Sequence, residues 1–490
     1  AASGSSYTLT TAVDSVVGSA SNDTIVGTLL ATGSTFTVAD TISGGNGTDT
    51  VTISSSGTSN SISAVTMSEV EVLKVIDAAA TKTTIDALSF SGLQTLKVDG
   101  STGAELQIDN LGNIVALELT SNLGSGDVVD VNYSAAATTG SADSQSITTD
   151  SSAATVELAG IESTSITTSG TASTIILTDA SATDVLATVT VAGSSALTLT
   201  GTGSTAITTV NAGSMTGALT LDVSAAASQN LTVTGGSGDD SINIGAVTAT
   251  DTVVGGAGTD TLITAAAVTA ANAAGVSGIE AVSIVNAAAG GAITQAAGAF
   301  SVDTYSIGDT NNQNVTLTGL TDEAVSFVAT STGTDTLTLA ADTVADSGTF
   351  NIGASAAGVT VTAISAANYE TLTINSSGGA NTITTLTAND ITSLTVTGST
   401  ALTITNAIAS ATGLATIDAS TMTKAVSINA SNSTGAVTFT GGSGGDTITS
   451  GAGNDTLTGG SGNDTLTAGN GTNTITGGAG DNTLTGGTGI

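Results

Sequence analysis

The stretch that decides the fold is a nonapeptide repeat at residues 441–485, which reads GGSGGDTIT, SGAGNDTLT, GGSGNDTLT, AGNGTNTIT, GGAGDNTLT and is followed by GGTGI. Each nonapeptide begins with small residues, mostly glycine, and has Ile or Leu at its eighth position. An oxygen-bearing side chain stands at every sixth position, so one polar and one apolar side chain recur with a fixed period. The sixth positions are Asp446, Asp455, Asp464, Asn473 and Asn482.

This pattern is typical of a calcium-binding parallel β-roll, in which GGxGxDxUx repeats wind a continuous coil. Glycine permits positive φ and lets backbone carbonyls approach an ion closely. The sixth-position carboxylate completes an oxygen cage of the kind that Ca²⁺ accepts, with about 6 to 8 ligands. The alternative is a Gly/Ser/Thr/Asn linker with accidental aspartates, which the constant apolar eighth position argues against.

Two nonapeptides make one coil of such a roll, so side chains eighteen residues apart should stack on the same side. The expected pairs across one ion are Asp446 with Asp464, Asp455 with Asn473, and Asp464 with Asn482. Because asparagine carries no charge, we expect the last two sites to bind calcium more weakly.

Composition excludes several classes of function. The chain has 40 acidic and 4 basic residues and a net charge of -36, so nucleic acid is not an expected partner, since phosphate binding needs clustered Lys and Arg. There is no histidine and no cysteine, which excludes imidazole acid–base chemistry and thiol nucleophiles. Ser443 lies in a GxSxG match but has no histidine partner. We therefore expect no enzyme, and calcium as the counter-charge.

Hydrophobic residues reach 39% and charged residues only 9%, which favours a folded chain over a disordered one. There is no run of about 18 apolar residues, so no transmembrane segment is expected. The N-terminus lacks the features of a Sec signal peptide, and the C-terminus falls inside a nonapeptide. These observations lead us to expect a segment of a longer protein.

The nonapeptide also occurs upstream, as GGNGTDTVT at 44–52, GGSGDDSIN at 235–243 and GGAGTDTLI at 255–263, and in degenerate form as GSASNDTIV at 18–26. Matches between the two halves of the chain keep offsets of 206 to 211 residues, which indicates an internal duplication. The expected parts are lead-in strands with a degenerate calcium turn at 1–43, one module at 44–243, its second copy at 244–440, and the calcium roll at 441–490.

Short β-branched stretches between Gly, Ser and Asn turns predict strands throughout, with one short helix possible in the Ala-rich stretch 265–281. An immunoglobulin-type sandwich usually has a large aromatic core residue, and this chain has no Trp. A narrow solenoid interior suits its Ala, Val, Ile and Leu better. We therefore expect an all-β right-handed parallel β-helix, or β-solenoid, with calcium-binding β-roll turns.

The candidate metal ligands follow from the repeat positions. The side-chain ligands are Asp23, Asp49, Asp240, Asp260, Asp446, Asp455, Asp464, Asn473 and Asn482. The candidate backbone carbonyls are those of Gly44, Asn46, Gly235, Ser237, Gly255, Ala257, Gly441, Ser443, Gly444, Gly453 and Gly462.

Four glutamates recur just before strands, at Glu71, Glu162, Glu280 and Glu370. They could reach back to a calcium turn as ligands, or they could be solvated residues at a strand edge that discourage aggregation. The sequence leaves both interpretations open.

The opening stretches SSYTLTTAVDSVVGSASNDTIVG (5–27), FTVADTISGGNGTDTVTIS (36–54) and VEVLKV (70–75) resemble the start of the crystalline region in Caulobacter-type S-layer proteins. The likeness covers about the first 80 residues and recurs from Gly255. It implies a two-dimensional, calcium-assembled coat of β-solenoid subunits on a Gram-negative cell, exported by a type I system. By position, the family's calcium carboxylates correspond to Asp49, Asp240, Asp260, Asp446, Asp455 and Asp464.

In that family a separate N-terminal domain binds lipopolysaccharide and an uncleaved C-terminal signal directs export, and neither is visible in this chain. We therefore expect an extracellular structural protein whose main partner is itself, in a homo-oligomeric lattice. A cell-surface or biofilm adhesin is the alternative. A calcium roll fused to a secreted enzyme would need a catalytic domain outside this sequence.

Overall fold

The computed structural model describes residues 4–58, 60–100, 105–120, 122–179, 184–285, 292–308, 314–353 and 357–488. These residues form a parallel β-solenoid of about 21 turns with almost no helix, which confirms the expected fold class. The chain divides into two compact units. Unit 1 contains Ala1–Gly245, Thr250–Asp260 and Gly275–Gly278, and unit 2 contains Ala246–Ala249, Thr261–Ala274 and Ile279–Ile490.

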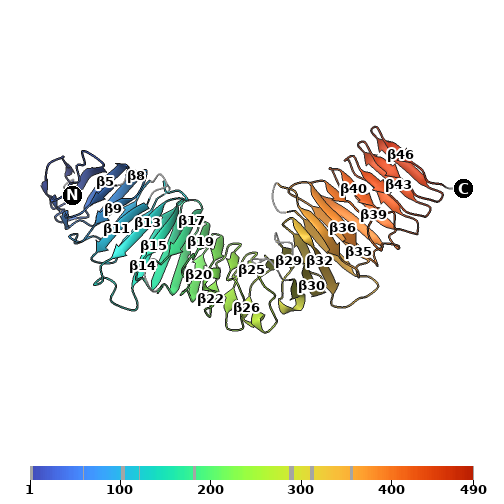
Figure 1. Ribbon diagram of the computed structural model, residues 1–490, viewed down its shortest axis with the longest axis horizontal. Coiled ribbons are helices and arrows are strands. Elements are labelled where there is room, and N and C mark those ends of the chain that lie inside the picture. Colours follow the sequence, from blue (N-terminus) through green and yellow to red (C-terminus); the bar gives the residue numbers. More distant parts are fainter. Residues whose placement is uncertain are drawn as a thin grey trace. The chain divides into compact units, whose positions relative to one another are not determined.

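Unit 1 is built from two long ladders of parallel strands, here called A and B, and a short one called C (Figure 1). Ladder A is β1 (Ser6–Thr8), β3 (Thr24–Leu30), β5 (Thr50–Gly57), β8 (Val72–Ala79), β10 (Thr95–Val98), β12 (Ala116–Leu119), β14 (Ser144–Asp150), β16 (Ser163–Ser169), β18 (Thr188–Gly193), β20 (Thr209–Met215), β22 (Thr232–Thr234), β24 (Thr252–Val254) and β26 (Val276–Ser277). Ladder B is β6 (Asn60–Ile62), β9 (Thr83–Asp86), β11 (Glu105–Leu111), β13 (Val128–Tyr133), β15 (Ala153–Leu158), β17 (Ser173–Thr178), β19 (Leu197–Thr200), β21 (Leu219–Asp222) and β23 (Ser241–Asn243). Ladder C is β2 (Ser15–Val17), β4 (Thr41–Ser43) and β7 (Thr66–Ser68).

Unit 2 has two ladders, called D and E, again with parallel neighbours (Figure 1). Ladder D is β25 (Thr261–Thr264), β27 (Ala281–Ile284), β29 (Thr304–Ile307), β31 (Ala324–Phe327), β33 (Ser347–Ile352), β35 (Thr371–Ser376), β37 (Ser393–Gly398), β39 (Thr416–Asp418), β41 (Thr438–Thr440), β43 (Thr456–Ser461) and β45 (Thr474–Ala479). Ladder E is β28 (Ile293–Ala296), β30 (Val315–Leu320), β32 (Ser331–Leu339), β34 (Thr360–Ser365), β36 (Asn381–Thr387), β38 (Leu402–Ile404), β40 (Val426–Asn429), β42 (Thr447–Thr449), β44 (Thr465–Thr467) and β46 (Thr483–Thr485).

Alternation along each strand places one set of side chains in the narrow core and the other in solvent. In ladder D the inward row runs through stacked, buried aliphatic residues such as Leu372, Leu394 and Ile417, each paired with the next. Medium-sized side chains fill this interior because neighbouring coils lie only about 4.8 Å apart. In the terminal roll Thr465 pairs with Thr483, so one coil takes eighteen residues, as expected from the repeat.

In the Ala-rich stretch 265–281, where the sequence allows one short helix, the structure has the 3₁₀ helix η2 (Asn272–Gly275), beside the strand β26. A Cβ at Gly275 would lie 2.1 Å from the Asp251 carbonyl oxygen, so the end of η2 packs closely against an earlier coil. The other described helical turns are η1 (Ser224–Ala226) and η3 (Ala297–Ala299). No helix in the described residues is long and apolar enough to cross a membrane.

Candidate metal centre

The most regular polar feature of the described residues is a set of buried aspartates placed directly before strands or, for Asp335, inside the strand β32. Each precedes Thr or Ser and then an aliphatic residue, as in Asp446, Thr447 and Ile448. Because side chains two apart share a face, the aspartate points the same way as the buried aliphatic residue. The aspartates of this kind are at most 2% exposed, and they are Asp23, Asp40, Asp49, Asp240, Asp251, Asp260, Asp335, Asp446, Asp455 and Asp464.

These carboxylates form side-chain ladders between coils. The backbone N–H of Asp446 donates to Asp464 Oδ1 at 2.8 Å, and that of Asp240 donates to Asp260 Oδ1 at 2.8 Å. In the N-terminal part of unit 1, the N–H of Asp23 donates to Asp49 Oδ1 at 2.6 Å. The aspartate of one coil is thus held by the aspartate of the next.

The second carboxylate oxygen, Oδ2, faces the glycines of its own turn. Gly442 N–H donates to Asp446 Oδ2 at 3.0 Å, and Gly236 N–H donates to Asp240 Oδ2 at 2.6 Å. In contrast, Asp49 Oδ2 and Asp464 Oδ2 are buried and have no hydrogen-bond partner. A buried charged oxygen without a partner is costly, so these atoms point to a bound cation.

Where a turn begins with glycine, the missing side chain leaves open the space into which the carboxylate points. The turn of Asp455 begins instead with Ser450, whose hydroxyl donates to Asp455 Oδ2 at 2.6 Å. A Cβ at Gly441 would lie 2.5 Å from Asp446 Oδ2 and 2.1 Å from the carbonyl oxygen of Gly459 in the next coil. The same arrangement recurs at Gly44, Gly235 and Gly255, where the Oδ2 of Asp49, Asp240 and Asp260 lies 2.5 Å from the added Cβ. At each of these glycines a carboxylate oxygen of its own turn and a carbonyl oxygen of the next coil lie around one open space, here called the glycine cradle. This all-oxygen donor set fits calcium.

The other candidate carbonyls lie elsewhere in the turns. Third-position residues fix the turn by donating their N–H groups to the preceding coil: Asn46 to Ser19 O, Ser237 to Met215 O, Ala257 to Gly236 O and Ser443 to Met422 O. The carbonyl at the fourth position of one nonapeptide lies against the glycine at the fourth position of the nonapeptide one coil later. The carbonyl oxygens of Gly444, Gly453 and Gly462 would lie 2.4, 1.8 and 1.9 Å from a Cβ at Gly462, Gly471 and Gly480.

The two asparagines change the polarity of the cradle. Asn473 and Asn482 still accept the N–H of Asp455 and Asp464 through Oδ1, at 2.8 and 2.9 Å. Their Nδ2 groups, however, donate to the carbonyls of Gly469 and Gly478. A donor therefore stands where Asp446 presents an acceptor, which disfavours a cation.

The glutamate of the next coil continues the ladder in three places. Glu71 accepts the N–H of Asp49 at 2.7 Å. Glu162 and Glu370 accept the N–H groups of Asp143 and Asp346, both at 2.8 Å. The Glu280 backbone carbonyl accepts N–H groups from the following coil, at 2.8 and 3.2 Å. Glu71, Glu162 and Glu370 thus each link one coil to the previous one. Glu71 follows the Gly44 turn and Glu280 follows the Gly255 turn, since Val72 pairs with Thr50 and Ala281 with Thr261.

Sequence reasoning missed three buried ladder aspartates. Asp14 N–H donates to Asp40 Oδ1 and Leu231 N–H to Asp251 Oδ1, both at 2.8 Å, and Val315 N–H donates to Asp335 Oδ1 at 3.3 Å. A search for the tripeptide Asp-Thr-aliphatic, with no requirement for glycines before it, would have identified all three aspartates. The same tripeptide at Asp342 is exposed, so the signal also gives a false match.

The electrostatics follow from burial. Loss of solvent raises the pKa of Asp240 and Asp446, and the pKa of Asp49 rises for the same reason and because Glu71 and Asp23 lie nearby. The backbone N–H groups of Ser19 and Ser5 lower the pKa of Asp23. A divalent cation would favour the ionised form of all these groups.

The profile of the RTX calcium-binding nonapeptide repeat matches four segments, residues 39–52, 248–266, 440–475 and 458–490. The chain carries RTX repeats. Such repeats bind calcium ions, several per repeat region, so the expected cofactor is confirmed. No curated protein matches the chain. Proteins with RTX repeats are typically secreted and extracellular.

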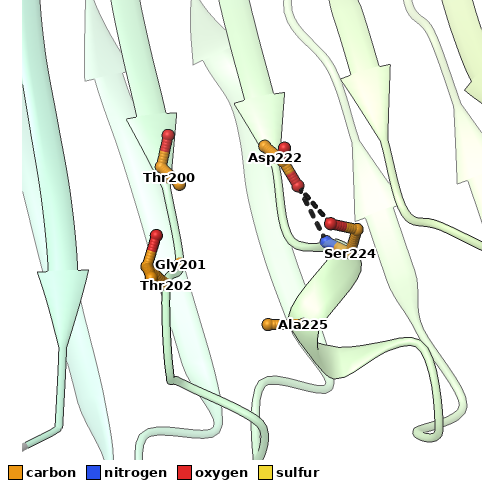
Figure 2. A pocket seen from close by; sticks show the side chains of 6 residues that line it. All are labelled: Thr200, Gly201, Thr202, Asp222, Ser224 and Ala225. Atoms are coloured by element: carbon orange, nitrogen blue, oxygen red, sulfur yellow. Dashed lines mark hydrogen bonds between the residues drawn. The ribbon is translucent and has the colours of Figure 1, made fainter. Parts of the chain in front are cut away.

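A shallow hollow of about 270 Å³ in unit 1 lies outside the RTX segments (Figure 2). Asp222 Oδ1 accepts hydrogen bonds from Ser224 N at 3.0 Å and Ser224 Oγ at 2.7 Å. Its carboxylate therefore caps the local turn, and we assign no site there. The hollow is lined by Thr200, Gly201, Thr202, Asp222, Ser224 and Ala225.

Proposed function

We propose that this secreted, calcium-binding RTX protein is a non-enzymatic subunit of a two-dimensional surface layer on a Gram-negative cell. The observation that carries the proposal is the recurrence of glycine cradles with buried carboxylates in each unit, at Asp49 and Asp240 in unit 1 and at Asp446 in unit 2. Calcium turns distributed in this way suit a structural subunit in which the ion orders long stretches of solenoid. The resemblance of the first 80 residues to S-layer proteins supports the same function.

Calcium acts through linkage, because a ligand that binds only the folded state stabilises it by mass action. Extracellular calcium modules bind at about 10⁻⁴ to 10⁻³ M, far above the calcium level of the cytosol. The chain would therefore remain unfolded for export and fold outside the cell. There, the partner in the lattice is another copy of the chain, and binding to lipopolysaccharide would use a region outside this sequence.

Electron microscopy of the purified protein tests the proposal. In millimolar CaCl₂ we expect ordered sheets, and in excess chelator we expect dispersed chains with a weaker β-sheet circular dichroism signal. Folded, calcium-bound monomers without sheets would contradict the lattice and favour the adhesin. An unchanged spectrum and unchanged sedimentation in chelator would contradict the role of calcium as well.

A further inference from the structure

A second kind of oxygen-rich environment lies inside unit 1, at the corner between ladders A and B. Ser55 in β5 and Asp77 in β8 are paired neighbours at one side of this corner. Asn60 in β6 and Thr83 in β9 are paired neighbours at the other side. These four residues, here called the Asp77 corner, come from two successive coils, and each is at most 3% exposed.

Hydrogen bonds connect the four side chains. Asn60 Nδ2 donates to Ser55 Oγ at 2.8 Å, and Ser55 Oγ lies 2.8 Å from Thr83 Oγ1. Thr83 Oγ1 lies 2.9 Å from Asp77 Oδ1, to which it donates. The chain of contacts therefore crosses from one coil to the next and ends on a carboxylate.

Two oxygen atoms of this corner take no part in these hydrogen bonds. Asp77 Oδ2 and Asn60 Oδ1 are buried and have no hydrogen-bond partner. Burial raises the pKa of Asp77, and the ammonium of Lys82, next to Thr83 in sequence, pairs with Glu105. Two unpartnered acceptors in one buried cluster are the pattern that a bound cation would explain.

Each row that contains the corner has an apolar neighbour on one side. Leu29 precedes Ser55 in ladder A, and Leu106 follows Thr83 in ladder B, and both leucines are buried. Each row thus continues into a buried leucine on one side, and the buried carboxylate of Asp127 in a later coil lies near enough to help raise the pKa of Asp77.

A corner in unit 2 shows how the same motif is satisfied without an acid. Asn381 Nδ2 donates to Ser376 Oγ at 2.9 Å, as Asn60 does to Ser55, and the serine again lies five residues earlier. Here, however, Asn381 Oδ1 accepts the N–H of Val359 at 2.8 Å. The corner in unit 1 differs by its carboxylate and by the two oxygens without partners.

We propose that the Asp77 corner binds one hard cation, held by the Asp77 carboxylate, the Asn60 amide oxygen and the hydroxyl oxygens of Ser55 and Thr83. Oxygen atoms 2.8 to 2.9 Å apart, as in this corner, are spaced like neighbouring ligands of an ion with metal–oxygen distances of about 2.3–2.6 Å. Hydroxyl groups can rotate to present their lone pairs. The ion would join two coils from inside the solenoid, independently of the RTX turns.

Anomalous diffraction tests this proposal and identifies the ion. Crystals of the chain grown in calcium are soaked with Sr²⁺, which replaces Ca²⁺, or with Tl⁺, which replaces a monovalent ion. We expect a peak within bonding distance of the Asp77 carboxylate in one of the two soaks. Strontium peaks at the RTX turns are the internal control and test the proposed function separately. Strontium at the RTX turns with no peak from either ion at Asp77 would overturn the proposal and make Asp77 a neutral acid.

Variants then test the ligands. Asp77→Asn should lose the corner peak and keep the peaks at the RTX turns, whereas Asn381→Ala in unit 2 should keep both. Ser55→Ala retains the carboxylate and should lower the occupancy of the corner, which provides a second measurement if Asp77→Asn does not fold. A peak of full height in Asp77→Asn and in Ser55→Ala would contradict the assigned ligands.

Discussion

The side chain at the sixth position of each nonapeptide directs one atom into the space above the first residue of the turn. Whether that atom is a carboxylate oxygen or an amide nitrogen decides how well the space suits a cation. Asp446 presents Oδ2 to the space above Gly441, whereas Asn482 presents Nδ2 to the equivalent space at Gly477, each 2.5 Å from an added Cβ. The hydrogen bond that Oδ1 accepts from the backbone N–H of the previous coil is the same for aspartate and asparagine. Fold and calcium affinity therefore depend on different atoms of one side chain.

Asn473→Asp should strengthen calcium binding in the terminal roll. The change replaces an amide donor to Gly469 O by a carboxylate acceptor, and a tenfold fall in the calcium midpoint corresponds to about 1.4 kcal/mol. Circular dichroism during a calcium titration measures the midpoint. The control is Asn470→Asp, which adds the same charge at an exposed position. Equal shifts in both variants would show that net charge alone is responsible.

Gly441→Ala should destabilise the roll, because its methyl group would lie 2.1 Å from Gly459 O and 2.5 Å from Asp446 Oδ2. Overpacking of this kind costs about 1–3 kcal/mol, and the calcium midpoint should rise as well. Gly435→Ala is the matched control, since an added Cβ there meets nothing within 4 Å. Thermal unfolding in saturating calcium compares Gly441→Ala with Gly435→Ala. Similar melting temperatures would contradict the claim that the space above Gly441 has no room for a methyl group.

Asp130 gives a pH dependence that is separate from calcium. Burial, with a contribution from Glu157, raises its pKa from the ordinary 3.8 to about 6 in the folded state. A raised carboxyl pKa means that the folded protein holds the proton more tightly, so stability falls as pH rises from about 4 to 6 and stays lower above. Asp130→Asn should therefore be more stable than wild type at pH 7 by about 3 kcal/mol, given about 1.4 kcal/mol per pKa unit.

Urea unfolding at pH 7 and pH 4 in saturating calcium checks this expectation, and the difference should vanish at pH 4. A difference of equal size at both pH values would point to packing instead of charge.

At the level of the strand and its turn, the glutamate rungs have two separable roles. Glu71→Gln keeps an oxygen that can accept the N–H of Asp49, whereas Glu71→Ala leaves that N–H without its acceptor, at a cost of about 1–3 kcal/mol. If Glu71 is only a rung, Gln should match wild type in unfolding and in its calcium midpoint, and Ala should be less stable. A calcium midpoint raised in Glu71→Gln, with stability unchanged in the absence of calcium, would instead make Glu71 a ligand.

The repeat predicted the solenoid and its coil length because its glycine, aspartate and aliphatic positions each have one structural use. It could not reveal Asp40 or Asp251, whose turns lack the glycines that drew attention to Asp446. Nor could it reveal the Asp77 corner, because Ser55 and Asp77 lie 22 residues apart in sequence and only the register of β5 and β8 brings them together. The short helix that the sequence allows near Asn272 is the 3₁₀ helix η2, which ends at Gly275, where the backbone packs closely against Asp251.

At the scale of the whole molecule, calcium should act on stability steeply and selectively. If several ions bind only the folded state, each tenfold rise in calcium above the dissociation constant adds about 1.4 kcal/mol per ion to the free energy of unfolding. Mg²⁺ should not substitute, since it demands near-octahedral geometry at about 2.0–2.1 Å and keeps its water. Urea midpoints measured across calcium and magnesium series check this, and equal effects of the two ions would contradict it.

The coil of eighteen residues in the terminal roll, marked by the pairing of Thr465 with Thr483, also determines how the chain should respond to force. Tension along the solenoid axis loads the coils one at a time, so the roll should come apart by peeling. Each coil released would lengthen the tether by about 55–60 Å, from about 3.3–3.6 Å per extended residue less a coil rise of about 4.8 Å. Bound calcium would set the rupture force, so in the proposed sheet the subunits should lengthen under osmotic load and rewind when the load is removed.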